Sequence, residues 1–399
     1  MTGKQNAPEI RFEGFTDPWE QRKLGELLLF QNGFNGSSES FGSGIPLISV
    51  MDVLDDKFIT HETVRGKARL NCEEASRYCV EYGDVLFQRS SENQEDAGTS
   101  NVYLDQHVSS AFGGFVIRGK KVGEYNPIFI KYLLGSPFIR EQITHRAQGA
   151  QQINVSQDTL ADVVLLMPSM REQEAVGLVF LHLDNLITLH QRKHDKLCTV
   201  KKSMLDKMFP KPGETEPEIR FEGFTDPWEQ RKFSDMYVVN NERNANCELG
   251  YDSTLSIATM TFNGGNGAAD DSLSNYKVIR IGDIAFEGHT NKVHAYGRFV
   301  LNDAGDGLMS PRFSCLRPIV EQRYSFWKYY IPREESMRPI LVNATKSGTM
   351  MNELVPDDLM RESILVPCLA EQEVIGNSLS QLDHLITLHQ REPQFADTG

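Results

Sequence analysis

The feature that most constrains the fold of this chain is an internal repeat. Residues 8–23 recur without a single change as residues 217–232, and residues 186–192 recur as residues 385–391. The first match has an offset of 209 positions and the second an offset of 199, so the second copy is ten residues shorter in between. A unit of about 200 residues is far longer than a solenoid repeat and predicts two related globular domains.

The likeness between the copies is uneven along the chain. At the 199 offset, residues 83–87 resemble 282–286 and residues 172–174 resemble 371–373, while the rest of the middles shares little. Identical ends can perform the same task twice, and divergent middles on one framework suggest one kind of task performed on two targets. A recent duplication with uneven drift is the alternative interpretation.

The middles have the sequence pattern of mixed, strand-rich structure. Short apolar or β-branched runs bounded by turn residues predict strands at 44–50, 84–87, 112–117, 276–281 and 312–316. Helical stretches rich in Phe, Tyr and Ile are expected at about 127–146 and 324–336, with these aromatic side chains in the core.

Each middle is followed by a long amphipathic helix. We predict the first over 172–209, ended by Pro210 and Pro212, because a three–four spacing of seam positions persists through Val176, Val179, Leu183, Leu186, His190, Lys193, Leu197, Val200 and Met204. The second unit repeats the start of this pattern at Ile375, Leu379, Leu382, Leu385 and His389. Since one amphipathic helix cannot bury its own seam, we expect the two helices to pair antiparallel about a pseudo-two-fold axis, with the globular domains at opposite ends of a rod.

The predicted fold class is therefore α+β, with two strand-rich domains separated by long antiparallel coiled-coil helices. The expected boundaries are 1–168 for the first domain, 169–212 for the first helix, 213–367 for the second domain and 368–399 for a second, shorter helix.

Composition restricts the location and the partners. No apolar run reaches the length of a membrane span, and the polar start of the chain lacks the core of a signal peptide, so we expect a cytoplasmic protein with its six cysteines reduced. The net charge of −14 weighs against nucleic-acid binding, although a basic face can coexist with acidic surfaces elsewhere.

Catalytic motifs are absent or weak. There is no P-loop, no adenine-methyltransferase motif of the Asn-Pro-Pro-Tyr type and no nuclease cluster, and residues 264–267 form only a flexible Gly-rich loop. His190 and His194 lie one helical turn apart but lack further metal ligands. We therefore expect no catalytic residue, cofactor site or metal site, and we predict that the chain is not an enzyme.

Several of these segments together resemble one family, the specificity (HsdS) subunits of Type I restriction-modification systems. The resemblance is carried by the Trp-Glu-Gln-Arg-Lys opening, residues 149–156, the step from Pro168 to Glu172-Gln173, the repeated Leu-Ile-Thr-Leu-His-Gln-Arg segment and residues 202–209. It covers essentially the whole chain in the order of the family, which is target-recognition domain, helix, target-recognition domain, helix.

The resemblance implies a non-catalytic DNA-reading subunit. Each recognition domain would read one half of a split site in double-stranded DNA, and the helices would act as a spacer. Two methyltransferase subunits would bind S-adenosylmethionine and methylate adenine, and restriction subunits using ATP and magnesium would cut the DNA.

Two other interpretations stay open at this point. Relative to the first helix, the second is interrupted at Pro393, soon after Arg391, which is expected of a truncated or silent specificity allele. The acidic balance is compatible with a coiled-coil scaffold whose globular ends bind other proteins.

Candidate DNA-binding residues follow from side chains that can reach base edges or phosphates. The first set lies in loops after matching strands: Gln88, Arg89, Ser90 and Ser91, and in the second unit His289, Thr290, Asn291 and Lys292. The second set lies in Gly-containing loops before a helix: Gln148, Gln151, Gln152 and Asn154, and Lys346, Ser347, Thr349 and Asn352. Backbone contacts are expected from Lys67, Arg69, Arg298 and Arg312.

Overall fold

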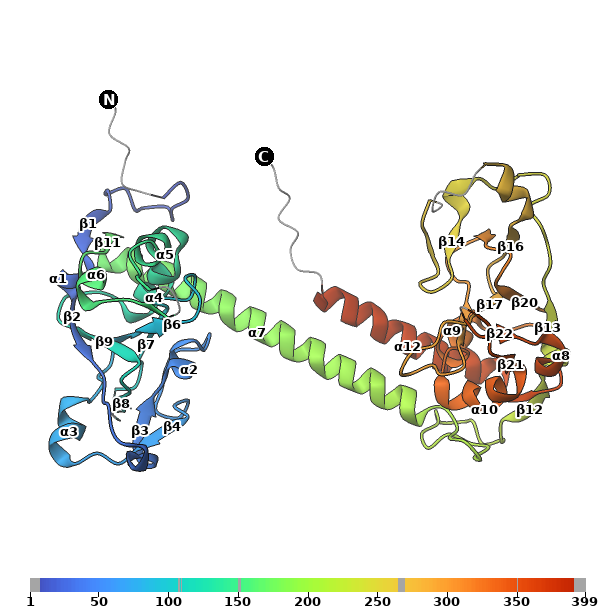
Figure 1. Cartoon of the computed structure of the whole chain (residues 1–399), viewed down its shortest axis with the longest axis horizontal. Helices are drawn as coiled ribbons and strands as arrows, with labels where there is room; N and C mark the ends of the chain where they lie inside the picture. The colour runs from blue at the N-terminus through green and yellow to red at the C-terminus, as the bar shows by residue number, and fades with distance from the viewer. Residues whose placement is uncertain are drawn as a thin grey trace. The chain divides into compact units, whose positions relative to one another are not determined.

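The computed structural model describes residues 8–106, 108, 110–149, 152–264, 270–349 and 351–390. Its chain divides into two compact units, Met1–Thr188 and Leu189–Gly399, so the boundary falls inside one long helix. Figure 1 shows that each unit combines several small sheets with short helices, as predicted for the α+β class.

Unit 1 is built around a four-stranded antiparallel sheet with the order β2-β9-β5-β7. Its elements, in chain order, are β1 (Glu20–Lys23), α1 (Leu24–Leu27), β2 (Leu28–Asn32), η1 (Ser38–Ser40), β3 (Phe41–Ile48), α2 (Val50–Val53), β4 (Gly66–Ala68), α3 (Cys72–Arg77), β5 (Val85–Gln88), β6 (Ser90–Ser91), β7 (Ser100–Val102), β8 (Ala111–Phe112), β9 (Val116–Lys121), α4 (Pro127–Gly135), α5 (Pro137–Thr144), β10 (Ile153–Asn154), α6 (Gln157–Ala161), β11 (Val164–Met167) and the start of α7 (Met170–Lys207).

One face of this sheet forms the main core of unit 1 together with α4 and α5. Val85 and Phe87 of β5 are fully buried there with Phe129 and Leu134 of α4, because strand residues at alternate positions point to the same face. The opposite face, with Leu86 of β5, packs on the smaller sheet β4-β3-β8. Strand β5 is buried along its whole length, so the polar residues that follow it are held on a rigid support.

Unit 2 repeats this plan. Its elements are β12 (Glu229–Lys232), α8 (Phe233–Met236), β13 (Tyr237–Val239), η2 (Tyr251–Ser253), β14 (Leu255–Ser256), β15 (Thr261–Phe262), η3 (Asp270–Asn275), β16 (Lys277–Ile279), β17 (Ile284–Glu287), β18 (Arg298–Leu301), β19 (Gly307–Met309), β20 (Ser314–Pro318), α9 (Tyr324–Tyr330), α10 (Glu334–Ala344), β21 (Thr345–Lys346), β22 (Glu353–Leu354), α11 (Pro356–Leu359), β23 (Ser363–Val366) and α12 (Leu369–Gln390).

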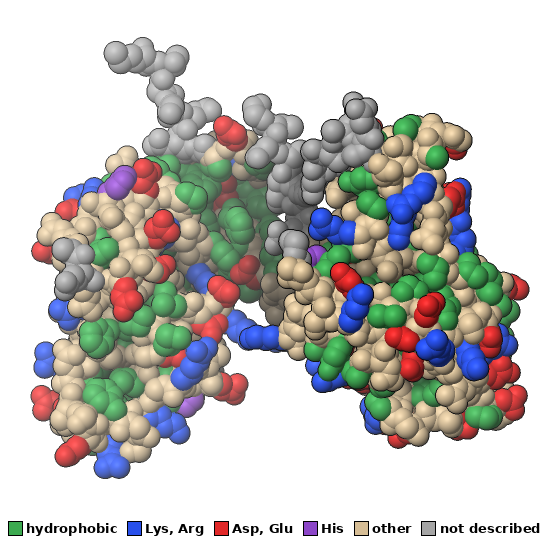
Figure 2. All heavy atoms as spheres, turned by 45° about the vertical axis from the view of Figure 1, so that its right-hand side comes forward, with side chains coloured by type: hydrophobic (Ala, Val, Ile, Leu, Met, Phe, Trp, Pro, Cys, Tyr) green, Lys and Arg blue, Asp and Glu red, His purple; other side chains and the backbone are tan. Residues whose placement is uncertain are grey.

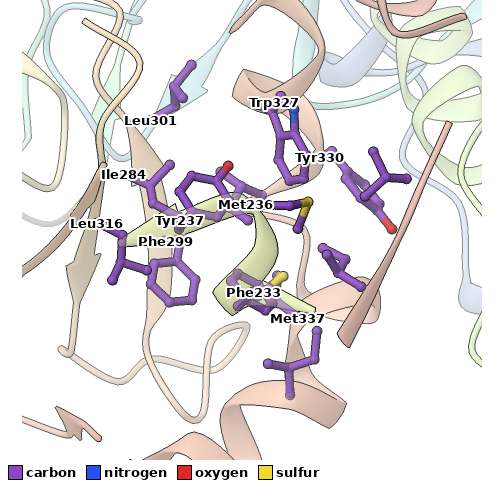
Figure 3. Close-up of a cluster of buried hydrophobic side chains, with 14 of the residues drawn as sticks. Phe233, Met236, Tyr237, Ile284, Phe299, Leu301, Leu316, Trp327, Tyr330 and Met337 are labelled. Atoms are coloured by element: carbon purple, nitrogen blue, oxygen red, sulfur yellow. The ribbon is translucent and has the colours of Figure 1, made fainter. Parts of the chain in front are cut away.

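The central sheet of unit 2 has the order β13-β20-β17-β18 and is antiparallel throughout. Figure 3 shows its aromatic core, in which Phe233, Tyr237, Phe299 and Trp327 gather between the sheet and α9. Ring pairs such as Tyr237 and Trp327, whose centroids lie 5.9 Å apart at an interplanar angle of 88°, have the edge-to-face geometry that aromatic rings prefer.

The predicted long helix is confirmed as α7, displaced by two residues from the expected range. In unit 2 its second half runs antiparallel to α12: His190 faces His389 with 3.1 Å between their Nδ1 atoms, and Lys201 pairs with Asp383, nearer the start of α12. The antiparallel pairing expected from the heptad pattern therefore holds within unit 2.

The identical ends of the two units form the same internal connection. Arg11 makes two hydrogen bonds to Glu172 (2.8 and 2.7 Å), and Arg220 makes two to Glu371 (2.9 and 2.8 Å). In addition β1 pairs with β11, and β12 pairs with β23 in the equivalent register. The repeated segments thus tie the start of each unit to the start of its long helix, and we name each Arg–Glu connection a clasp.

Candidate DNA interface

The two sets of candidate residues in unit 1 lie next to each other. Strand β6 pairs antiparallel with β10, so that Ser90 is opposite Asn154. Ser90 Oγ donates to Asn154 Oδ1 at 2.5 Å, and the backbone N–H of Val155 donates to the carbonyl of Arg89 at 3.0 Å. Residues that are more than sixty positions apart therefore form one continuous polar surface beyond the end of β5.

Unit 2 joins its two sets in the corresponding way. The backbone N–H of Asn352 donates to the carbonyl of Gly288 at 2.9 Å, and its side-chain amide donates to Ala295 O at 3.4 Å. A Cβ atom at Gly288 would lie 1.9 Å from Asn352 O, so this close approach requires glycine. Gly288 is the equivalent of Arg89 at the 199 offset, whereas Asn352 is the equivalent of Ile153, so both units join the same two loops but in registers that differ by two residues.

Some candidates in these loops are buried and support the others. Gln88 is 5% exposed and its Nε2 donates to Ser90 O at 3.0 Å, and Ser91 is also buried with its Oγ accepting from the Asn93 N–H. The counterpart of Gln88 is Glu287, which is buried and holds both His289 (2.8 Å) and Arg298 (3.2 Å). Because a buried side chain cannot reach a base edge, Gln88 and Ser91 shape the loop from inside.

The exposed members of the second loop in unit 1 are Gln148, Gln152 and Asn154. Gln148 and Asn154 exchange backbone hydrogen bonds of 3.1 and 2.8 Å, which close the loop between them. Gln151 lies outside the described residues. An exposed amide on a closed, hydrogen-bonded loop can present its donor and acceptor in a fixed direction, as reading of an adenine edge requires.

Lys67 and Arg69 lie on β4 and just after it, on the smaller sheet. Lys67 lines an apolar cavity of about 700 Å³ together with Phe115 and Gly114. Arg89 connects this cavity to the loop pair, because its N–H donates to Phe115 O at 2.9 Å and its guanidinium reaches Gly114 O at 3.4 Å. Arg69 donates to Ser43 Oγ at 2.7 Å and is not among the cavity-lining residues.

In unit 2 the first loop is a turn ordered by Asn291. Its Oδ1 accepts from the N–H groups of Val293 and His294, each at 2.8 Å, while the side chains of His289, Thr290 and Lys292 are exposed. Arg298 is held by Glu287 and by Ala258 O at 2.8 Å, which leaves it less free to reach a phosphate.

The remaining candidates of unit 2 are on the surface. Lys346 pairs with Glu353 at 3.3 Å, and Ser347 and Thr349 are exposed in the same hairpin. Arg312 is exposed in the turn before β20, where no described contact joins it to the loop pair.

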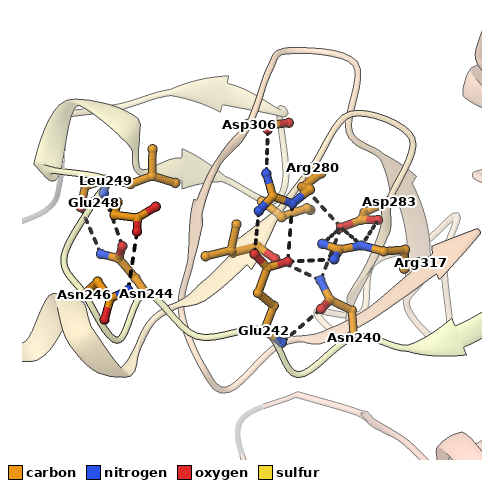
Figure 4. A network of polar contacts seen from close by, with 12 residues as sticks. Asn240, Glu242, Asn244, Asn246, Glu248, Leu249, Arg280, Asp283, Asp306 and Arg317 are labelled. Carbon is orange, nitrogen blue, oxygen red and sulfur yellow. Dashed lines mark hydrogen bonds and ion pairs between the residues drawn. The ribbon is translucent and has the colours of Figure 1, made fainter.

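Sequence reasoning missed a buried ionic network under each loop pair. In unit 1, Arg118 Nε donates to the buried carboxylate of Asp84 at 2.7 Å. In unit 2, Arg317 binds Asp283 through two nitrogens at 3.0 and 2.9 Å, and Figure 4 shows how Glu242 and Arg280 extend this network. The sequence signal for these networks was the Gly-Asp pair at residues 83–84, which recurs 199 positions later at residues 282–283.

The electrostatics of the two networks differ. Burial raises the pKa of Asp84, while the charge of Arg118 and two backbone N–H donors oppose that rise. The hydrogen bond from Arg280 lowers the pKa of the Glu242 carboxyl, and burial raises the pKa of the Cys315 thiol to about 12. The carboxylates of Asp84 and Glu242 serve to fix strands under the loops. Cys315 stays an uncharged thiol within the core.

Charge is intermixed on the molecular surface. Figure 2 shows lysine, arginine and acidic side chains interspersed with hydrophobic ones on the face in view. Lys67, Arg69 and Arg89 form no ion pair with described residues of unit 1, so their charges are available. Among the described residues no group of three metal-ligating side chains could hold an ion, and no helix is long and apolar enough to cross a membrane.

A crystal structure of the HsdS subunit from Thermoanaerobacter tengcongensis superimposes on the chain with a TM-score of 0.50. The match covers 97% of this chain and 94% of that one, at 17% sequence identity. The chain has the HsdS fold. The resemblance inferred from the sequence is thus confirmed at the level of the fold, over both units and both long helices.

The chain is also similar to a curated protein and to a second solved structure. A Methanocaldococcus jannaschii protein named "Putative type I restriction enzyme MjaX specificity subunit" is 23% identical over 214 residues, which are 52% of this chain. The chain spans about half the length (49%) of this curated relative. A type I restriction-modification S subunit from M. genitalium has a TM-score of 0.49 at 12% identity, covering 95% of this chain and 92% of that one. No family model matches the chain.

Proposed function

We propose that the chain is the DNA-specificity subunit of a type I restriction-modification complex and that each unit reads one half of a split site. The observation that carries the proposal is the recurrence of one loop pair in both units on an HsdS fold. In each unit the second loop donates a backbone N–H to the equivalent carbonyl of the first loop, Val155 to Arg89 and Asn352 to Gly288, although the two donors are two positions apart in the repeat and the loops share almost none of their side chains. A shared frame with different polar side chains is what two half-sites of different sequence require.

In unit 1 the reading surface consists of Arg89, Gln148, Gln152 and Asn154, with Lys67 toward the phosphates. In unit 2 it consists of His289, Lys292, Lys346 and Asn352, with Thr290, Ser347 and Thr349 beside them. Arginine favours guanine and amides favour adenine, so the two surfaces differ in their preferred bases. The intermixed charge of the molecule argues for local contacts and against a broad basic face.

The chemistry of the complex would reside in its other subunits. Two methyltransferase subunits would bind S-adenosylmethionine and methylate adenine in each half-site, and restriction subunits would use ATP and magnesium. The chain itself would contribute binding and position, in keeping with the lack of catalytic motifs in its sequence.

The decisive test is methylation mapping after co-expression of the chain with its methyltransferase subunit in a host without such a system. We expect adenine methylation at one split motif and none when the chain is omitted. The variant Asn154→Ala should weaken recognition of one half of the motif, and Asn352→Ala the other half. If the assembled complex methylated no split motif, the proposal would be refuted. A scaffold without DNA specificity would give a complex with unaltered genomic methylation.

A further inference from the structure

The first loop of unit 2 carries a side chain whose hydrogen-bonding chemistry is fixed by the fold. His289 Nδ1 lies 2.8 Å from Oε1 of Glu287, the buried last residue of β17. The other oxygen of that carboxylate, Oε2, accepts from Arg298 Nε at 3.2 Å. A carboxylate paired with arginine is ionised and only accepts hydrogen bonds, so the hydrogen of this contact must be on Nδ1 of His289.

The other ring nitrogen of His289 is left for an outside partner. In a neutral imidazole with its hydrogen on Nδ1, Nε2 has a lone pair and acts as an acceptor. The side chain of His289 is 60% exposed, whereas that of Glu287 is 9% exposed. No hydrogen bond joins Nε2 to the part of the chain that the structure describes. The ring therefore presents one acceptor, and no donor, at the surface of the loop.

The backbone on both sides of His289 is held as well. Gly288 is closed against the second loop, because its carbonyl accepts from the Asn352 N–H and a Cβ atom there would lie 1.9 Å from Asn352 O. On the other side, Asn291 Oδ1 orders the turn that follows. His289 is thus anchored through its ring and its backbone, which gives its acceptor a fixed direction, as the reading of a base edge requires.

Unit 1 uses the equivalent positions differently. At the 199 offset, Ser90 corresponds to His289 and Gln88 corresponds to Glu287. The hydroxyl of Ser90 donates to Asn154 Oδ1 at 2.5 Å, and its carbonyl accepts from Gln88 Nε2 at 3.0 Å. These groups of Ser90 are engaged inside the loop pair. The same frame therefore offers an outward imidazole acceptor in unit 2 and a serine turned to internal contacts in unit 1.

We propose that His289 is a specificity-determining residue of unit 2 and that its neutral ring accepts, through Nε2, a hydrogen bond from an amino group on a base edge. In the major groove this group is adenine N6 or cytosine N4. Glu287 is the positioning residue that selects the tautomer. Guanine O6 and thymine O4 are themselves acceptors, so they would face Nε2 with two lone pairs and no hydrogen between them. This assignment rests on the proposed DNA-reading function.

The tautomer is measured on the whole chain without DNA. Isotope-edited NMR of the chain labelled at its histidine nitrogens, at about pH 8 where histidine is ordinarily neutral, shows which ring nitrogen carries the hydrogen. The signal that is lost in His289→Ala assigns the residue. We expect the Nδ1–H form in the wild type and a mixture of tautomers in Glu287→Gln, because an amide can donate to Nδ1 as well as accept from it. An Nε2–H ring or an imidazolium in the wild type would overturn the proposal.

The base preference is measured with the complex of the chain and its methyltransferase subunit, on DNA in which each base of the half-site read by unit 2 is varied in turn. We expect a preference for adenine or cytosine at one position and about tenfold weaker binding when that base is replaced by an analogue without the amino group. His289→Ala should remove the preference at that position alone, so that the analogue causes no further loss. His289→Lys, which can only donate, should shift the preference to guanine or thymine. His384→Ala, a change of an exposed histidine on α12, is the matched control and should retain the wild-type preference.

Two results of the binding series would contradict the role of His289. Equal weakening by His289→Ala whatever the base would indicate a phosphate contact. A wild-type preference for guanine or thymine at the position that His289→Ala alters would contradict the acceptor role. Failure of the proposed function has a different signature. A complex that methylates no split motif removes both proposals, whereas a split motif that His289→Ala leaves unchanged removes only this assignment.

Discussion

Single residues under the two loop pairs hold the strands in register through buried charge. Asp84 and Arg118 connect β5 to β9, and their counterparts Asp283 and Arg317 connect β17 to β20. Such a pair adds little net stability over an apolar pair, but removal of one partner leaves an uncompensated charge in the interior. The loops that follow β5 and β17 depend on this fixed support for their direction.

The variant Arg118→Met should lose about 3–5 kcal/mol of unfolding free energy near neutral pH, because Asp84 remains buried without its cation. The pKa of Asp84 is already raised by burial and should rise further once the opposing charge is gone. A carboxyl whose folded pKa exceeds its unfolded pKa gains stability as the pH falls, so the deficit should shrink toward pH 5.

Urea unfolding of unit 1 at several pH values measures this effect. The double variant Arg118→Met/Asp84→Asn is the control and should recover most of the loss, because it leaves no buried charge. A deficit that does not change with pH would show that packing, and not the charge of Asp84, is responsible.

Side chains on the proposed reading surface should affect recognition of one half-site at a time. Asn154→Ala removes an exposed amide from β10, and we expect a loss of about 1–3 kcal/mol in affinity for DNA carrying the cognate half-site. The matched variant Asn352→Ala in unit 2 should reduce affinity through the other half-site only. Binding of the assembled complex to DNA with one altered half-site at a time measures both effects. Equal sensitivity of both half-sites to Asn154→Ala would contradict the assignment.

At the scale of elements, helices that depend on a local sequence pattern were predicted well. Features that depend on burial by distant parts of the chain were not. The heptad seam located α7 within two residues, because a periodic signal over many turns is a property of the local sequence. The helix expected at 127–146 is instead α4 and α5, separated at Ser136, since Pro137 begins a new helix and disfavours helical backbone before it.

The same distinction applies to the strands and to the candidate site. The strand expected at 112–117 is interrupted by a turn at Gly114 and Phe115, and so is divided between β8 and β9. The sequence located both loop pairs because polar residues follow apolar strands. It could not tell that Gln88 points inward, because that depends on the neighbours that the fold brings to it.

The two long helices allow a matched test of packing. Ile386→Ala in α12 should cost about 2–5 kcal/mol, since its side chain is buried. Ile187→Ala, at the equivalent position of unit 1, should change stability by less than about 0.5 kcal/mol, because the residue is exposed. Thermal or urea unfolding of the two variants measures the difference. A large loss for Ile187→Ala in the isolated chain would mean that its face is already packed.

On the scale of the whole molecule, the two units repeat one plan, and under the proposed function each has a reading surface of its own. Under that proposal, replacement of residues 24–150 by the corresponding middle of an HsdS subunit should change one half of the methylated motif and leave the other half intact. Methylation mapping of the chimaera together with its parent tests this, with residues 233–350 exchanged as the reciprocal control. If both halves changed in either chimaera, the units would not read independently.

The clasps have a consequence for how such a chain, under the proposed function, could acquire a new base preference. Arg11 and Glu172 belong to the identical ends, as do Arg220 and Glu371, and the diverged residues lie between the two members of each pair. A genetic crossover within these ends would deliver a complete clasp with whatever middle came with it. Under the proposed function, recombination between alleles would then replace the base preference of one unit in a single event, with no compensating mutation needed to keep the new unit attached to its helix.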